Sequence, residues 1–181
     1  VCRREGVPFV SKIDLAVQYI EQFEVVPDTQ THLLLDSWYH CKRVRHAAQA
    51  RGWNVSGGLK SNRVMRLTTT DGRREWLKLS QYLTQLTAAD WQPVSWPSGQ
   101  GGQTMYAHLA KTWIRKLGPT LLLITCHSLS EPLNQVRYWG STAMNLEAQD
   151  LVNTLAKRWE IETFFECDKD LLGSDHYQVM T

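Results

Sequence analysis

The sequence predicts an α/β fold that starts as helix–strand–helix–strand, continues as a mostly β segment and ends in one long helix. Residues 11–59 alternate between apolar residues at helical spacing and short apolar runs typical of strands. Residues 60–142 hold several short strand-like runs separated by turn residues. The chain has 181 residues, of which 43% are hydrophobic and 21% charged, a composition typical of one soluble globular domain carrying an insertion.

The first four elements follow from local signals. Ser11 to Asp14 has the form of a capping box, and Ile13, Val17 and Ile20 then mark an amphipathic helix to about Glu24. The apolar run Thr31–Asp36 predicts a strand buried on both faces, with Asp36 at its carboxyl end. Ser37 is expected to cap a second helix from Trp38 to about Arg51, with Gly52 as its stop, before a strand over Trp53–Leu59. This order favours a largely parallel sheet.

The segment from Lys60 to Thr142 changes character. Asp71-Gly72 is a strong turn dipeptide and predicts a hairpin between Arg63–Leu67 and Arg74–Leu77. A short helix over Leu79–Leu86 should follow, and the last strands are expected to return to the main sheet. Five further runs are candidate strands: Trp91–Trp96, Thr104–Leu109, Lys111–Leu117, Leu121–Thr125 and Arg137–Ser141.

The final helix should run from Asn145 or Glu147 to about Leu172, with Gly173 as its stop. Arg158, Glu162 and Lys169 lie on one face of this helix, within about 40° of each other at about 100° per residue. The same helix also carries the apolar side chains of Ile161, Phe164, Phe165 and Leu172. A carboxylate between two cations on such a helix suggests a functional site.

Asp36 and Glu162 are the candidate metal ligands. Carboxylates on a strand end and on a crossing helix are the arrangement that two divalent ions need for phosphoryl transfer, and Mg²⁺ or Mn²⁺ prefers such oxygen ligands. A structural explanation is also open, in which Asp36 caps its own turn and Glu162 forms a surface ion pair with Arg158.

Positive charge is concentrated in one stretch, although the net charge is only +2. Ser37 to Thr70 contains no Asp or Glu, which suits either a polyanion or a solvated helix face. Its cations are Lys42, Arg43, Arg45, Arg51, Lys60, Arg63 and Arg66. Arg158 and Lys169 are candidates for clamping phosphates, and Trp159 either stacks on a base or packs in the core.

Several other functions find little support. The four cysteines are far apart, which excludes a CxxC zinc site or a disulfide framework and suggests a reducing cytoplasm. His40-Cys41, Cys126-His127 and His176 lack a second ligand at suitable spacing. No G-x-x-x-x-G-K-[ST] loop for a nucleotide and no membrane-spanning run is present.

Two groups of residues resemble insertion-sequence transposases. Leu33-Leu-Leu-Asp-Ser-Trp-Tyr39 with Gly58-Leu-Lys-Ser-Asn-Arg63 resembles their second catalytic segment. Gly140-Ser-Thr, Arg158-Trp-Glu-Ile-Glu162-Thr-Phe-Phe and Lys169 resemble the third, followed by Leu172-Gly and His176-Tyr-Gln178. The subgroup signature is Tyr, two residues, Arg, three residues, Glu, six residues, Lys. Arg158, Glu162 and Lys169 match it, whereas Leu155 stands in place of the Tyr that is thought to hold DNA.

The resemblance implies a transposase of the DDE, RNase H-like superfamily. Its fold would be an RNase H-like core, a mixed sheet with flanking helices, interrupted by the β insertion: residues 1–59 and 143–181 form the core and 60–142 the insertion. Asp36 and Glu162 would be catalytic carboxylates holding two Mg²⁺ (or Mn²⁺) ions. Arg158, Lys169, Trp159, Lys60 and Arg63 would contact DNA, both element ends and target. A homodimer on paired ends, a cytoplasmic, nucleoid-associated location and no nucleotide cofactor are further expectations.

The first catalytic carboxylate of this superfamily has no counterpart in the sequence. It should end a strand upstream of the helix at Ser11, and Asp14 and Asp28 lie instead in a helix and a turn. The chain is therefore expected to lack the first strands and to be inactive alone. Two alternatives stay open: a DNA-binding remnant without chemistry, and an RNase H-like nuclease without strand transfer.

Overall fold

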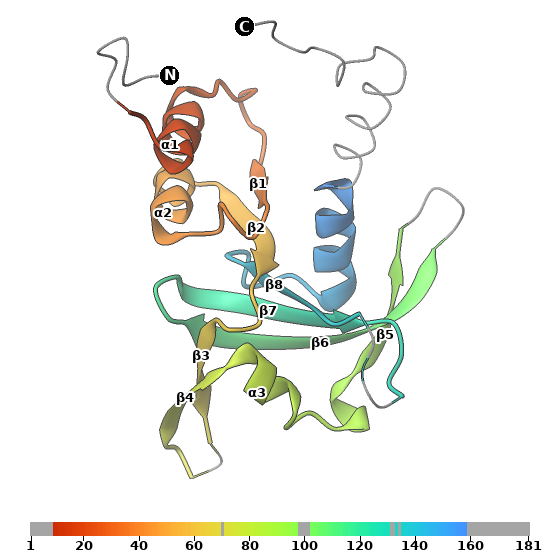
Figure 1. Cartoon of the computed structure of the whole chain (residues 1–181). Coiled ribbons are helices and arrows are strands. Elements are labelled where there is room, and N and C mark those ends of the chain that lie inside the picture. The colour runs from red at the N-terminus through yellow and green to blue at the C-terminus, as the bar shows by residue number, and fades with distance from the viewer. Residues whose placement is uncertain (1–8, 70, 98–101, 131–132, 134, 159–181) are drawn as a thin grey trace, which may run out of the picture.

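The computed structural model describes residues 9–69, 71–97, 102–130, 133 and 135–158. In these residues one open sheet is flanked by helices (Figure 1). This mixed sheet with flanking helices confirms the predicted fold class and is consistent with an RNase H-like core. No described helix is long and apolar enough to cross a membrane.

The first four elements appear in the predicted order. Helix α1 (Lys12–Gln22) starts with the expected capping box, and strand β1 (His32–Leu35) follows. Helix α2 (Lys42–Ala50) ends before Gly52, whose φ of +74° permits the reversal into β2 (Asn54–Leu59). Helix α2 starts four residues later than predicted, because residues 37–39 form a turn instead.

The remaining strands largely match their predicted positions. Strands β3 (Val64–Thr68) and β4 (Arg74–Lys78) form the expected hairpin, followed by α3 (Leu79–Leu83), a short 3₁₀ helix η1 (Ala88–Asp90) and β5 (Gln92–Trp96). The prediction of separate strands before and after Ala110 was wrong. A single long strand, β6 (Gln103–Ile114), runs through both, and its residues Tyr106 to Ile114 pair with β7 (Gly118–Cys126).

The sheet order is β1-β2-β8-β7-β6-β3-β4, with β5 paired to β6. Strand β8 (Arg137–Ser141) returns to pair with β2, as expected of the last strands before the final helix. The expectation of a largely parallel sheet was wrong, since β1 and β2 are the only parallel pair among the described strands. Antiparallel hairpins need only short turns, which is what residues 60–142 supply.

Strand β1 is less buried than predicted. It pairs only with β2 and so lies at the edge of the described sheet, where three of its four residues are half-buried. Its carboxyl end and that of β2 meet at one edge, because the two strands are parallel and in register from His32↔Asn54 to Leu35↔Gly57. Asp36 follows directly at that edge.

Three apolar clusters hold the layers together. Helices α1 and α2 pack on β1 and β2 through Ile20, Leu35, Val44 and Val55. Helix α3 packs beneath the β3, β6, β7 and β8 region through Leu79, Leu122, Ile124 and Tyr138. The third cluster joins the final helix to the opposite face of β7 and β8 through Leu121, Leu123, Trp139, Leu151 and Leu155.

The final helix is described from residue 148 to residue 158. Figure 1 shows it, in blue, on the side of β1 and β2 opposite to α1 and α2. Its packing against β7 and β8 brings its carboxyl end toward the same edge as Asp36. The rest of the predicted helix, with Gly173 as its stop, lies outside the described residues.

Candidate active site

Asp36 is held by the turn that follows β1. Its Oδ1 accepts hydrogen bonds from the Trp38 backbone N–H at 3.1 Å and from the Ser37 hydroxyl at 3.0 Å. The Asp36 carbonyl accepts from the N–H groups of Tyr39 and His40, each at 3.1 Å. The prediction that Ser37 caps α2 was therefore wrong: Cys41 is the N-cap, and Ser37 bonds to Asp36.

The Asp36 carboxylate is exposed and ionised at neutral pH. The Trp38 N–H is the main group that holds the pKa of Asp36 below its ordinary value, with the Ser37 hydroxyl and the charge of Arg158 acting in the same direction. An ionised carboxylate fixed by its own turn at the end of a strand can bind a hard cation. The structural explanation, in which Asp36 caps its turn, is correct and is compatible with that chemistry.

Asp36 and Arg158 line one cleft of about 390 Å³, here called the Asp36 cleft. The rest of its wall comes from Leu35, Ser37, Gly58, Leu59, Ser61 and the four residues Val136 to Trp139. Residues 122 positions apart in the sequence thus lie across one opening. An anion bound beside Arg158 would also lie near the carboxylate that is expected to hold metal.

Lys60 and Arg63 lie in the turn after β2, close to the Asp36 cleft. The Lys60 Nζ lies 4.6 Å from the centroid of the Trp38 ring, and the Trp38 side chain is 77% exposed. Arg63 donates a hydrogen bond to the His40 carbonyl at 2.9 Å and so fixes the turn that follows Asp36. The arrangement gives Arg63 a structural contact and leaves Lys60 at the surface with an aromatic neighbour.

The cations of residues 42–66 do not form one continuous solvated strip. Arg43 pairs with Asp14, Arg51 donates to the Ile20 and Glu21 carbonyls, and Arg66 lies over the Trp113 ring at 5.3 Å. Arg45 is buried and donates to Thr120 at 2.9 Å. Most of these cations therefore serve packing as well as charge, which the sequence pattern does not reveal.

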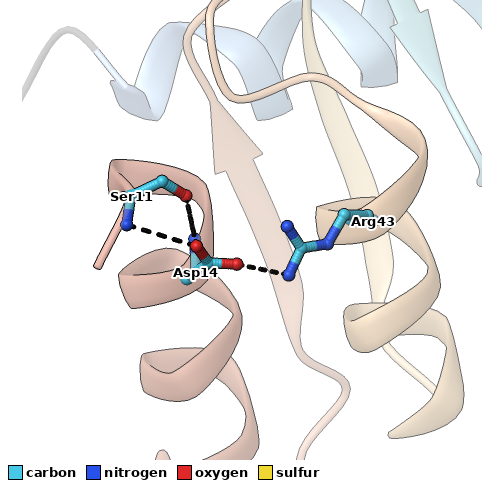
Figure 2. Close-up of polar contacts among 3 residues, drawn as sticks. All are labelled: Ser11, Asp14 and Arg43. Carbon is cyan, nitrogen blue, oxygen red and sulfur yellow. Dashed lines mark hydrogen bonds and ion pairs between the residues drawn. The ribbon is translucent and has the colours of Figure 1, made fainter. Parts of the chain in front are cut away.

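Asp14 has a structural role outside the Asp36 cleft. Figure 2 shows its carboxylate between Ser11 and Arg43, closing the capping box of α1 and joining it to α2. The Ser11 hydroxyl is the main cause that lowers the pKa of Asp14, and Arg43 adds to it. These contacts account for Asp14 without any catalytic role.

Three of the predicted site residues, Glu162, Lys169 and Trp159, lie outside the described residues. Leu155, at the family's Tyr position, is described: it is 1% exposed and packs against the cluster of Leu121 and Trp139. An apolar side chain in the core makes no contact with DNA from this position. The same helix therefore directs Leu155 inward and Arg158 into the Asp36 cleft.

His40 is buried behind the Asp36 turn. Burial lowers its pKa to about 4, so the ring is neutral near pH 7. Its Nδ1 lies 3.3 Å from the Gly58 carbonyl oxygen, and no partner of Nε2 is found among the described residues. In the described part of the chain, no group of three or more His, Cys, Asp or Glu side chains is placed to hold a metal ion.

The sequence profile of the transposase DDE domain matches residues 10–179. The chain belongs to the transposase DDE domain family. No curated protein sequence matches it significantly. The family match covers both segments that carry the resemblance, including Asp36, Arg158 and Glu162. Membership of this family supports a general function in DNA transposition.

Some residues of this transposase domain's cleft were not anticipated from the sequence. Arg137 and Tyr138 reach it from the start of β8, and Ser61 reaches it from the turn after β2. Trp38 stands beside it. Trp38 belongs to the Asp-Ser-Trp-Tyr segment that carried the resemblance, so the sequence held a signal for its place near the site. Arg137 and Tyr138 were predicted only as part of a strand, and no pattern linked them to the site.

Proposed function

We propose that this chain supplies two of the three carboxylates of a DDE transposase that cuts DNA at the ends of an element and joins them to a target. The observation that carries the proposal is the position of Asp36: an exposed, ionised carboxylate at a strand end, in one cleft with Arg158. Family membership over residues 10–179 supports it.

The donor set of Asp36 fits a divalent ion. The carboxylate is charged at neutral pH, lies at the surface, and is of the oxygen type that Mg²⁺ and Mn²⁺ prefer. Asp36 and Glu162 would hold two such ions, which when bound supply an activated water and stabilise the attacking and leaving oxygens. A third carboxylate would be needed to complete the site.

The side chains of this domain then act on the DNA. Arg158 and Lys169 hold phosphate oxygens next to the carboxylates, and Trp159 and Lys60 contact the DNA close by. Water attacks the scissile phosphate and releases a 3′ hydroxyl. That hydroxyl next attacks a target phosphodiester in line, forming one P–O bond as another breaks, so the number of phosphodiester bonds is conserved.

Turnover by the 181-residue chain alone is not expected, because Asp14 is engaged by Ser11 and Arg43 and cannot serve as the missing carboxylate. Action as a homodimer on paired DNA ends, in the cytoplasm and associated with the nucleoid, is part of the same proposal. So is the division into core residues 1–59 and 143–181 and a mostly β insertion over 60–142.

Mn²⁺ binding, followed by electron paramagnetic resonance, tests the proposal. We expect binding by the wild-type chain that is lost in Asp36→Ala and in Glu162→Gln and kept in the matched control Asp14→Ala. Binding that ignores Asp36 and Glu162 would contradict it. Cleavage of supercoiled plasmid with Mn²⁺ that Glu162→Gln abolishes would overturn the expected inactivity of the chain alone.

A DNA-binding domain without chemistry is the second candidate. The cationic groups along residues 42–66, several of them turned toward the surface, favour it. It predicts salt-dependent DNA binding that requires neither a metal ion nor the carboxylates of Asp36 and Glu162. A nuclease that only hydrolyses would share the Asp36 site and would differ by releasing nicked DNA without joining it to a target.

A further inference from the structure

Arg45 is a buried cation that has no acidic partner among the described residues. Its side chain is 2% exposed, and it donates hydrogen bonds to the Thr120 hydroxyl at 2.9 Å and to the Pro119 carbonyl. Its Nε has no hydrogen-bond partner among the described residues, and none of their ion pairs includes it. A guanidinium removed from water without a counterion is unfavourable unless an anion approaches it.

Arg45 lines a cleft of about 520 Å³, here called the Arg45 cleft. One face of α2 provides Lys42, Arg45, His46 and Gln49, which follow helical spacing. Lys116, at the tip of the β6–β7 hairpin, faces them. None of the described residues that line this cleft is acidic, so its positive charge is not neutralised there.

The backbone of the hairpin is shaped to place Lys116 in this wall. Lys116 has a φ of +69° and Gly118 a φ of +93°, and the Leu117 N–H bonds to the Ile114 carbonyl at 3.0 Å. A lysine in the left-handed region is uncommon and is held here by a tight turn. The hairpin and α2, which are about 70 residues apart in the sequence, thus converge on one cationic opening.

The Arg45 cleft is separate from the Asp36 cleft. Arg137, Tyr138 and Trp139 of β8 line the Asp36 cleft, whereas Thr142 and Met144, just beyond its end, line the Arg45 cleft. Thr142 lies three positions after Trp139, which is about 10 Å at about 3.4 Å per residue. That distance corresponds to about three base pairs of duplex rise.

We propose that the Arg45 cleft binds backbone phosphates of DNA, at a distance from the bond cut at Asp36. The ligand is a phosphodiester oxyanion, and its identification as DNA rests on the proposed function. Lys42 from α2 and Lys116 from the hairpin contact phosphate oxygens at the surface, and the buried charge of Arg45 attracts the anion from behind them. Such contacts are independent of base sequence and position the duplex while the chemistry proceeds elsewhere.

Fluorescence anisotropy of a labelled 30-base-pair duplex, with the 181-residue chain in EDTA and over a series of KCl concentrations, tests the site. The variant is Lys42→Gln with Lys116→Gln, both exposed positions that need not disturb folding. Each lost phosphate contact lowers the slope of log K against log salt by about 1. We expect a slope lower by about 2 and affinity reduced roughly tenfold at 100 mM salt.

The matched control is Lys12→Gln with Lys78→Gln, which removes equal charge from exposed positions outside the cleft. An equal loss in both double variants, or none in the cleft variant, would overturn the proposal. Inorganic phosphate as competitor distinguishes a small-anion site: displacement of DNA by a few millimolar phosphate, beyond the effect of equal ionic strength of chloride, would overturn the assignment to DNA.

Asp36→Asn separates this inference from the proposed function. It should abolish Mn²⁺ binding, whereas the double lysine variant, which leaves Asp36 in place, should keep it. If Asp36→Asn loses Mn²⁺ binding but the double lysine variant keeps the wild-type salt slope, the transposase proposal is retained and the Arg45 cleft is rejected as a DNA site. If the double lysine variant has a reduced salt slope but Asp36→Asn still binds Mn²⁺, the Arg45 cleft is retained and the metal site at Asp36 is rejected.

Discussion

The backbone N–H of Trp38 donates a hydrogen bond to Oδ1 of Asp36 at 3.1 Å, so the proposed metal ligand is also the structural centre of its own turn. An asparagine at position 36 keeps an oxygen acceptor for this bond but loses the charge. The two roles of the carboxylate can therefore be tested independently.

Asp36→Asn should leave the free energy of unfolding nearly unchanged and remove Mn²⁺ binding. Asp36→Ala should remove Mn²⁺ binding and also cost about 1 kcal/mol, because the Trp38 N–H and the Ser37 hydroxyl lose their acceptor. Urea denaturation and Mn²⁺ titration check both results. Equal stability of the two variants would show that the turn does not depend on this acceptor.

Gly57 lies where β1 and β2 approach closely. A Cβ at this position would stand 2.5 Å from the Leu35 carbonyl oxygen, a backbone atom that cannot move without breaking the parallel pairing. Gly57→Ala should therefore cost about 3 kcal/mol or more in urea denaturation. The change should also disturb Asp36, which follows Leu35.

Gly140→Ala is the matched control, because the atoms nearest to its Cβ would be side-chain carbons of Leu59 and Thr120, the closest at 3.0 Å, and not backbone atoms. These groups can shift, so the expected cost is about 1 kcal/mol. Similar losses in the two variants would contradict the argument that backbone contact sets the cost.

Acid should destabilise the fold through His40. Its pKa is 6.5 when unfolded and about 4 when buried, so the unfolded state binds the proton first as pH falls. The contribution to stability is fully present above pH 6.5 and is lost progressively down to pH 4, with a total of about 3 kcal/mol. His32, whose pKa burial also lowers, acts in the same direction.

Urea denaturation of the wild type and of His40→Asn between pH 4 and pH 7 measures this dependence. The variant should be less stable at pH 7 and show a flatter pH profile. His46→Gln, at an exposed position of α2, serves as the control and should keep the wild-type profile. A variant profile as steep as the wild type would assign the acid sensitivity to other groups.

Ser11→Ala should cost about 1 kcal/mol, because the N–H of Asp14 loses its acceptor and the capping box opens (Figure 2). Mn²⁺ binding and DNA binding should not change, since Ser11 and Asp14 lie outside both clefts. Thermal denaturation measures the first effect. A loss of Mn²⁺ binding in this variant would give the Ser11–Asp14 pair a role that its contacts do not explain.

Much of the fold could be predicted because its signals are local. The capping box of Ser11 and Asp14 and the Asp71-Gly72 turn act within three or four residues, and the structure has both. The start of α2 was misplaced, because Ser37 has the composition of a cap and only the structure shows its hydroxyl bonded to Asp36. Two strands were predicted on either side of Ala110, yet β6 continues through it because β7 pairs with it from Tyr106 to Ile114.

For the candidate site, the sequence alone selected the candidate residues: the spacing and the family resemblance pointed to Asp36, Arg158 and Glu162. Only the tertiary structure decided that Asp36 and Arg158 share a cleft, that Leu155 is buried in the core, and that Arg45 and Lys116 meet in another cleft. Helix caps and turns depend on neighbours in the chain, whereas clefts depend on strand pairing between distant segments. The pairing of β2 with β8 joins residues more than 70 positions apart, and no local pattern in either strand specifies it.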